Sequence, residues 1–458
     1  MNIANSPEVQ AAISLVAARL ENERKARNIP GISAGIVIDQ ELVWHQGYGV
    51  ANVTNQTPAN EKTVYRVASI TKLFTATMLM QLRDAGKLNL DDPIDKYLPE
   101  LKLNSKFPDA KPPTFKQIVS HASGLSREGE HEGWISGTMP GLEDLFRMAN
   151  EIEMRLPAWT EPKYSNLAIA LLGHALSRIA EQPYAEYIHE HILEPLGMAN
   201  SSFNRSRYGE DTYGVGYQLD ENDAYKEAMY WATEGHIGAG ALFSNVEDIA
   251  RFISLQFREG GAGGAQILGS TTLREMHMPV SVTPDFESGY GIGWGIRRVG
   301  GFKVVGHSGG LPGFTTNITL VPPLKLAAIA FTNYETAPAL ITQGMLETLI
   351  PAVQGEIERQ EVKADRATRD QWTAYLGEYR GDSYDDHVYI EIVDKRLTLF
   401  EIGANPSTFT QLEPTSFGQH IFKLVGGYVS GDYATFQVDE AGRVTGLRLG
   451  AYPLWKTR

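Results

Sequence analysis

Ser69 and Lys72 have the spacing that most directly suggests chemistry, because they form the one Ser-x-x-Lys in the chain. An apolar repeat predicts a helix over 69–85, where residues three apart share a face with Cβ atoms about 5–6 Å apart. Unpaired N–H groups at the helix start would stabilise an oxyanion beside Ser69. A buried Lys72 would lose its proton readily and act as a base. The alternative is a helix-capping serine with a surface lysine.

Tyr164 and Asn166 stand at the start of a second predicted helix, 166–179. A phenol near a cationic lysine has its pKa pulled down and can relay a proton to or from a leaving group. The Asn166 amide would orient the lysine or a substrate carbonyl. Alone, the pair would more simply be a partly buried tyrosine and a helix cap.

His307, Ser308, Gly309 and Gly310 follow a predicted strand, 303–306. The glycines would let substrate lie against the strand edge, with Ser308, Gly309 and Gly310 as binding residues. A Gly310 N–H would complete an oxyanion hole. A loop histidine among glycines also occurs as a purely structural feature.

The elements that must position these residues alternate between strands at the ends of a region and helices in its middle. Strand-like runs are predicted at 31–38, 41–47, 293–299, 303–306, 315–321 and 326–332, and a further helix at 246–257. This order favours one α+β domain over 1–350, whose sheet is completed by both of its ends. The charged segment 351–371 is expected to be a helical linker. Short strands at close spacing then predict a small all-β barrel over 372–458.

Composition excludes several functions. The net charge of −14 disfavours nucleic acid and anionic lipid as partners. The absence of cysteine removes disulfides, thiolate metal sites and a cysteine nucleophile. The segment with Glu128, Glu130, His131 and Glu132 is interpreted as a solvated loop rather than a metal site. Without a recognisable leader or membrane span, we expect a soluble cytoplasmic protein.

Taken together, the ordered motifs resemble those of the serine β-lactamase and penicillin-binding-protein superfamily, particularly its class-C-like peptidases and esterases. Further similar segments are Leu90–Pro93, Tyr97–Pro99, His121–Leu125, Glu194–Met198, Ala239–Ser244 and Phe331–Asn333. The resemblance implies an antiparallel sheet flanked by helices, an all-α subdomain beside it, and a site in the cleft between them. The tail after Trp372 resembles the lipocalin-like barrel appended to some of these hydrolases.

The resemblance also implies roles for the residues. Ser69 would be the nucleophile, Lys72 its base and Tyr164 the proton shuttle, while Asn166 contacts lysine and substrate. The N–H groups of Ser69 and Gly310 would form the oxyanion hole. No metal or organic cofactor is implied.

His307 stands where β-lactamases of this class carry a lysine. Histidine is mostly neutral near pH 7, so the substrate carboxylate loses a permanent cation. This form resembles peptidases, amidases and esterases, and implies weak or no β-lactamase activity. We therefore expect a serine hydrolase acting through an acyl-serine on a small-molecule or peptide substrate. The alternatives are acyl transfer, including transpeptidation and peptide cyclisation by a thioesterase relative, and a non-catalytic binding protein. A homo-oligomer is left open.

Overall fold

The structure, a computed structural model, describes residues 3–233, 235–259, 263–382, 387–394, 396–403, 409–415, 418–427 and 429–457, without the side chains of 134 and 361–371. The chain divides into two compact units, Met1–Gln354 and Gly355–Arg458. Helix α11 begins in the first and ends in the second. The predicted charged linker, 351–371, lies within this helix, and most of its side chains fall outside the described part.

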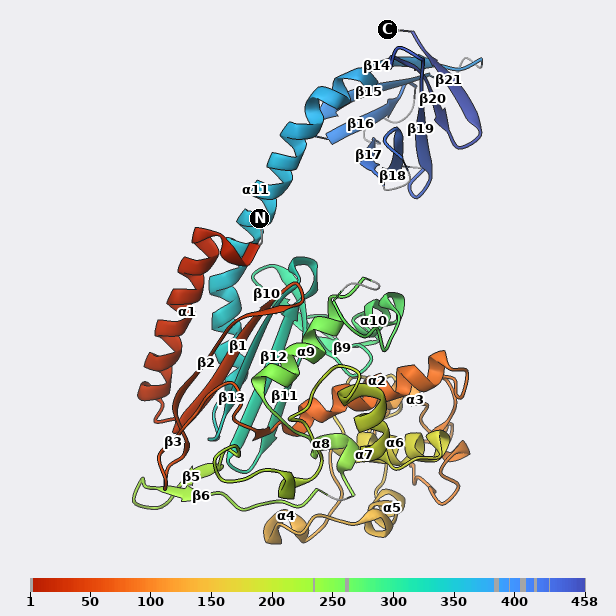
Figure 1. Ribbon diagram of the computed structural model, residues 1–458. Coiled ribbons are helices and arrows are strands. Elements are labelled where there is room, and N and C mark those ends of the chain that lie inside the picture. Colours follow the sequence, from red (N-terminus) through yellow and green to blue (C-terminus); the bar gives the residue numbers. More distant parts are fainter. Residues whose placement is uncertain are drawn as a thin grey trace. The chain divides into compact units, whose positions relative to one another are not determined.

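A nine-stranded antiparallel sheet forms the centre of the first unit (Figure 1). Its strand order is β3-β2-β1-β13-β12-β11-β10-β9-β8, so strands from the two ends of the unit meet at β1 and β13. Both central strands are buried along their length, as in sheets covered on both faces. The strands are β1 (Gly31–Ile38), β2 (Glu41–Asn52), β3 (Thr57–Pro58), β8 (Ser281–Val282), β9 (Gly289–Tyr290), β10 (Gly295–Val299), β11 (Phe302–Leu311), β12 (Phe314–Val321) and β13 (Leu326–Thr332).

Helices cover this sheet on both faces. Helix α1 and the first turns of α11 lie on one face, and α9 packs on the other against β1 and β13 (Figure 1). Helix α1 is capped by Ser6, whose hydroxyl accepts from the Val9 N–H at 3.2 Å, and it begins with proline. The helices of these layers are α1 (Pro7–Ala26), α9 (Val246–Gln256), α10 (Ser270–Met276) and α11 (Pro338–Trp372).

A mostly helical part lies beside the sheet (Figure 1) and packs around α6. The apolar sequence of α6 is buried from Leu167 to Gly173, and the helix contacts α2, α3, α5, α7 and α8. Short strand pairs, β4 (Tyr65–Arg66) with β7 (Phe243–Ser244) and β5 (Tyr217–Leu219) with β6 (Tyr225–Glu227), complete the unit. The helices are α2 (Thr71–Asp84), α3 (Phe115–Val119), α4 (Gly133–Ser136), α5 (Leu142–Glu151), α6 (Asn166–Ala180), α7 (Tyr184–Ile188) and α8 (Ile237–Gly240).

The second unit contains a closed eight-stranded barrel, which confirms the predicted all-β domain. Each strand pairs with the next, and β21 pairs back with β14, so the described barrel has no open edge. Alternate residues such as Ile390, Leu399 and Leu447 are buried in its interior. The strands are β14 (Gly377–Arg380), β15 (His387–Val393), β16 (Arg396–Glu401), β17 (Thr410–Pro414), β18 (Ile421–Val425), β19 (Tyr433–Val438), β20 (Val444–Leu449) and β21 (Tyr452–Lys456).

One boundary matters for the site. The sequence places His307 after a strand that ends at Gly306, but β11 continues to Leu311. Residues 307–311 pair with Phe314–Ile318 of β12, and this pairing supplies the backbone partners that a loop would lack.

Among the described residues, no helix combines the length and apolar character needed to cross a bilayer.

Candidate active site

Ser69 lies in a tight turn between the sheet and α2. A 3-10 turn, Ala68–Ile70, leads into α2, and Ala68 has a φ of +49°, a conformation that costs an alanine free energy. Strand β11 passes so close that a Cβ at Gly309 would lie 2.2 Å from the Val67 carbonyl oxygen. Only glycine fits there. Ser69 itself is partly exposed.

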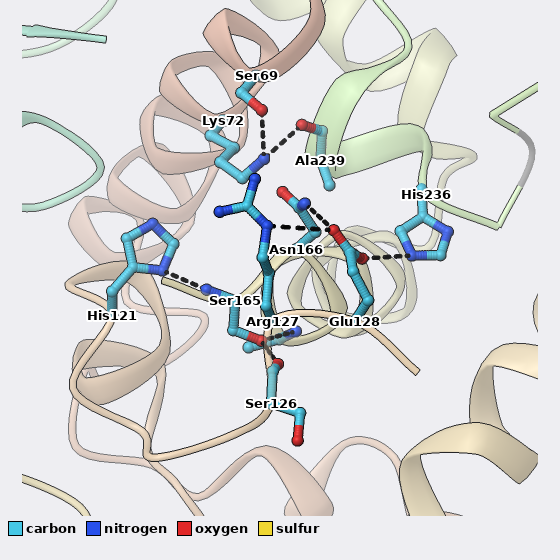
Figure 2. Close-up of polar contacts among 11 residues, drawn as sticks. Ser69, Lys72, His121, Ser126, Arg127, Glu128, Ser165, Asn166, His236 and Ala239 are labelled. Carbon is cyan, nitrogen blue, oxygen red and sulfur yellow. Dashed lines mark hydrogen bonds and ion pairs between the residues drawn. The ribbon is translucent and has the colours of Figure 1, made fainter. Parts of the chain in front are cut away.

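Lys72 lies one helical turn after Ser69 and is 1% exposed. Its Nζ is 3.0 Å from Ser69 Oγ and donates to the Ala239 carbonyl oxygen at 2.7 Å (Figure 2). Burial lowers the pKa of Lys72 to about 7, while the charge of Glu128 opposes this shift and that of Arg127 adds to it. A large fraction of Lys72 is therefore neutral near pH 7 and able to accept the Ser69 proton.

Tyr164 comes from the distant segment before α6 and packs among the same residues. Its ring centroid is 5.1 Å from Lys72 Nζ and 6.1 Å from the His307 ring centroid. The expectation that Lys72 lowers the phenol pKa is wrong in direction. Burial raises the pKa of Tyr164 well above its usual value, and a hydrogen bond with Ser69 only partly offsets this. The phenol thus remains protonated near pH 7 and is equipped to donate.

Asn166 begins α6, which Ser165 caps by accepting from the Ala168 N–H at 3.0 Å. The Asn166 amide Nδ2 donates to Glu128 Oε1 (Figure 2), and its buried Oδ1 has no hydrogen-bond partner among the described residues. The expected contact with Lys72 is therefore replaced by one with Glu128. Glu128 is not part of a solvated loop, because its side chain is only 24% exposed and burial raises its pKa. The sequence pattern alone did not indicate that the Glu128 carboxylate belongs to the site.

The residues 307–310 alternate along β11. His307 and Gly309 are buried, whereas Ser308 and Gly310 are exposed beside the cavity. Burial, with the Lys72 charge, lowers the pKa of His307 to about 3 against its hydrogen bond with the Ser308 carbonyl, so the imidazole is neutral near pH 7. Ser308 Oγ accepts from Asn317 Nδ2 at 2.7 Å. The strand edge thus presents a neutral, polar surface next to Ser69.

Two hollows meet at Ser69. The larger, of about 640 Å³, runs along β11 and includes Tyr164, His307, Ser308 and Gly309. The smaller, of about 270 Å³, includes Glu128 and His236 with the apolar side chains Met139, Trp231 and Leu311. Ser69, Arg127, Asn166 and Gly310 line both. A nucleophile at such a junction has room for substrate on either side of a scissile bond.

Like Glu128, His121 lies near the site although the sequence assigned it no role there. It is buried, and its Nδ1 accepts from the Ser165 N–H at 3.3 Å (Figure 2), while its ring lies 4.4 Å from that of Tyr164. Burial lowers its pKa well below the usual value. The segment His121–Leu125 resembles the family but suggests no contact with a distant tyrosine. Across the described part of the chain, no three His, Asp or Glu side chains are grouped as metal ligands.

Comparison with known proteins identifies similar sequences and folds. A family described as Beta-lactamase matches residues 16–346. "Beta-lactamase-like protein 2" of Dictyostelium discoideum is 32% identical over 363 residues, which are 76% of this chain and 64% of that protein. The chain thus spans less than two thirds of the length of this curated relative.

Solved structures extend the likeness to both units. The octameric penicillin-binding protein homologue from Pyrococcus abyssi has a TM-score of 0.67 and 26% identity, covering 97% of this chain and 100% of that one. A class C β-lactamase, 20% identical with a TM-score of 0.64, covers 76% of this chain and 98% of its own and shares the fold. The match over most of the first unit and the fold shown by these structures lead to one conclusion: the chain belongs to the β-lactamase family.

Proposed function

We propose that the protein is a serine hydrolase that cleaves an amide or ester bond of a peptide or amino-acid-derived substrate through an acyl-Ser69 intermediate. One observation carries this proposal. Lys72 Nζ lies 3.0 Å from Ser69 Oγ in surroundings that lower the lysine pKa to about 7. A non-catalytic binding protein would gain nothing from this costly burial of an amine.

The reaction begins when neutral Lys72 takes the Ser69 hydroxyl proton and Oγ attacks the substrate carbonyl carbon. The backbone N–H groups of Ser69 and Gly310 stabilise the oxyanion that forms. The bond to the leaving amine or alcohol then breaks, and Tyr164 donates the proton that the leaving group needs, regaining one from Lys72. Attack by water on the acyl-serine releases the carboxylic acid and restores Ser69.

The test is labelling by a fluorophosphonate followed by intact-mass analysis. We expect one adduct on the wild-type protein and none on Ser69→Ala. Turnover of p-nitrophenyl esters and aminoacyl anilides would then establish hydrolysis. An unlabelled wild-type protein, or an adduct that persists in Ser69→Ala, would contradict the proposal.

We further propose that the chain self-associates. The support is the likeness to an octameric homologue that covers 97% of this chain at 26% identity. Light scattering coupled to size exclusion should give a mass of at least twice the 50.5 kDa of one chain. A mass equal to one chain at micromolar concentration would refute this.

A further inference from the structure

Two buried oxygen atoms near the nucleophile have no hydrogen-bond donor within the part of the chain that the structure describes. Asn166 Oδ1 and Glu128 Oε2 lack a hydrogen-bond partner among the described residues, although both side chains line the smaller hollow with Ser69. Buried acceptors in folded proteins are nearly always satisfied. Two neighbouring exceptions in a substrate hollow indicate that a ligand supplies the missing donors.

The hydrogen bond between the two side chains fixes which atoms face the ligand. An ionised carboxylate only accepts hydrogen bonds, so the Asn166 amide must direct Nδ2 toward Glu128 Oε1. Its oxygen consequently points away from Glu128 (Figure 2). Among the described residues, the pair therefore leaves two acceptor oxygens, Asn166 Oδ1 and Glu128 Oε2, without a donor, which suits a group rich in N–H bonds.

Glu128 Oε2 has no hydrogen-bond partner among the described residues, and the charged groups around the pair do not supply one. Arg127 Nε is 3.9 Å from Glu128 Oε1, and Lys72 directs its hydrogen bonds to Ser69 and Ala239. His236 Nε2 is 3.9 Å from Oε2, but burial lowers the pKa of His236 to about 4, so this ring carries no charge near pH 7. On the side of Oε2, the carboxylate thus has no charged protein partner among the described residues near neutral pH.

The two hollows also differ in the part of the substrate that they suit. Tyr164, the proton donor to the leaving group in the proposed function, lines the larger hollow, whereas Glu128 lines the smaller one. The leaving group then occupies the larger hollow and the acyl part the smaller. Apolar walls from Met139, Trp231 and Leu311 are suited to an apolar side chain on that acyl part.

Resting on the proposed function, we infer that the substrate carries a free primary amino group on the acyl side of the scissile bond. Glu128 Oε2 and Asn166 Oδ1 bind this group as an ammonium ion. The substrate class is accordingly amino-acid amides, amino-acid esters or peptides with an unblocked N-terminus. Substrates whose amino group is acylated lose both the charge and two of the N–H donors.

The test compares phenylalanine p-nitroanilide, as both enantiomers, with its N-acetyl derivative. For the enantiomer that is cleaved, we expect kcat/KM to be roughly 10- to 100-fold higher for the free amine, the range for a hydrogen bond to a charged group. Glu128→Gln should reduce this ratio at least fivefold. The ratio is the readout because a change in the pKa of Lys72 affects both substrates alike. Glu130→Gln is the matched control, since Glu130 is exposed two residues away, and should leave the ratio unchanged.

Each result decides between the two proposals. A wild-type ratio near one, a preference for the N-acetyl substrate, or an unchanged ratio in Glu128→Gln would overturn the inference, even where Ser69 is labelled by the fluorophosphonate. Absence of that label would refute the proposed function itself, and the inference with it. If Glu128→Gln does not fold, the wild-type ratio alone decides the matter.

Discussion

The charge state of Lys72 should control how fast Ser69 is acylated. If the amine is the base, the acylation rate must rise with pH as Lys72 loses its proton and level off above its pKa of about 7. Two substitutions should move this inflection in opposite directions. Glu128→Gln removes a charge that raises the Lys72 pKa, and Arg127→Gln removes one that lowers it.

The magnitudes follow from burial. Lowering the pKa of Lys72 from 10.5 to about 7 corresponds to a free-energy change of about 5 kcal/mol between its two protonation states. At pH 7 about half of Lys72 is neutral, against about one part in 3,000 for an ordinary lysine. Removing one nearby charge should shift the inflection by about 0.5 to 1 pH unit, downward for Glu128→Gln and upward for Arg127→Gln.

The assay is the observed rate of labelling by an uncharged fluorophosphonate between pH 5 and 10, followed by intact mass, with Ser69→Ala as the blank. The three histidines and the tyrosine near Ser69 should not interfere. The pKa values of His121, His236 and His307 are lowered by burial, that of His236 to about 4 and that of His307 to about 3, and the pKa of Tyr164 is raised. An inflection near pH 10, a flat profile, or a shift of both variants in the same direction would refute the reasoning.

Three further outcomes are expected. Gly309→Ala should lower the free energy of unfolding by about 1–3 kcal/mol and reduce labelling of Ser69, because the added Cβ would lie 2.2 Å from the Val67 carbonyl oxygen. Gly310→Ala is the control and should retain the wild-type melting temperature, because a Cβ there meets open space. Tyr164→Phe should slow turnover about 10²- to 10⁴-fold in steady-state assays while thermal melting stays within a few degrees, because the packed ring is kept. Lys72→Met should raise the free energy of unfolding in urea by about 1–4 kcal/mol at pH 6. The folded-state pKa of Lys72 lies below 10.5, so its burial penalty is absent above pH 10.5 and complete below about 7, and the gain should disappear at high pH.

The sequence predicts the pairing of Ser69 with Lys72 because both lie on one helix, where spacing alone sets their relation. The contact of Tyr164 with both is suggested by the family resemblance, since no local pattern relates α6 to α2. The orientation of Asn166 is not predictable in this way. It depends on Glu128, whose burial arises from tertiary packing.

Among the strands, too, local sequence predicts some boundaries, while tertiary contacts set others. Strand β1 and strand β13 agree with the predicted ranges, since each is a mostly apolar run. Strand β11 extends five residues past its predicted end because β12 supplies backbone partners to a glycine-rich stretch of low intrinsic strand preference. The roles of Ser308, Gly309 and Gly310 in substrate binding stay predictions.

The pairing of β1 with β13 has a consequence for synthesis of the chain. The Gly31 N–H donates to Asn333 Oδ1 across 302 positions, so the first sheet strand to leave the ribosome waits for one made much later. At about 5–20 residues per second, that wait lasts about 15–60 s. During it, the apolar β1 hairpin exposes an unpaired edge of the kind that recruits other nascent chains. We therefore expect the yield of folded protein in cell-free synthesis to improve when a chaperone shields this hairpin.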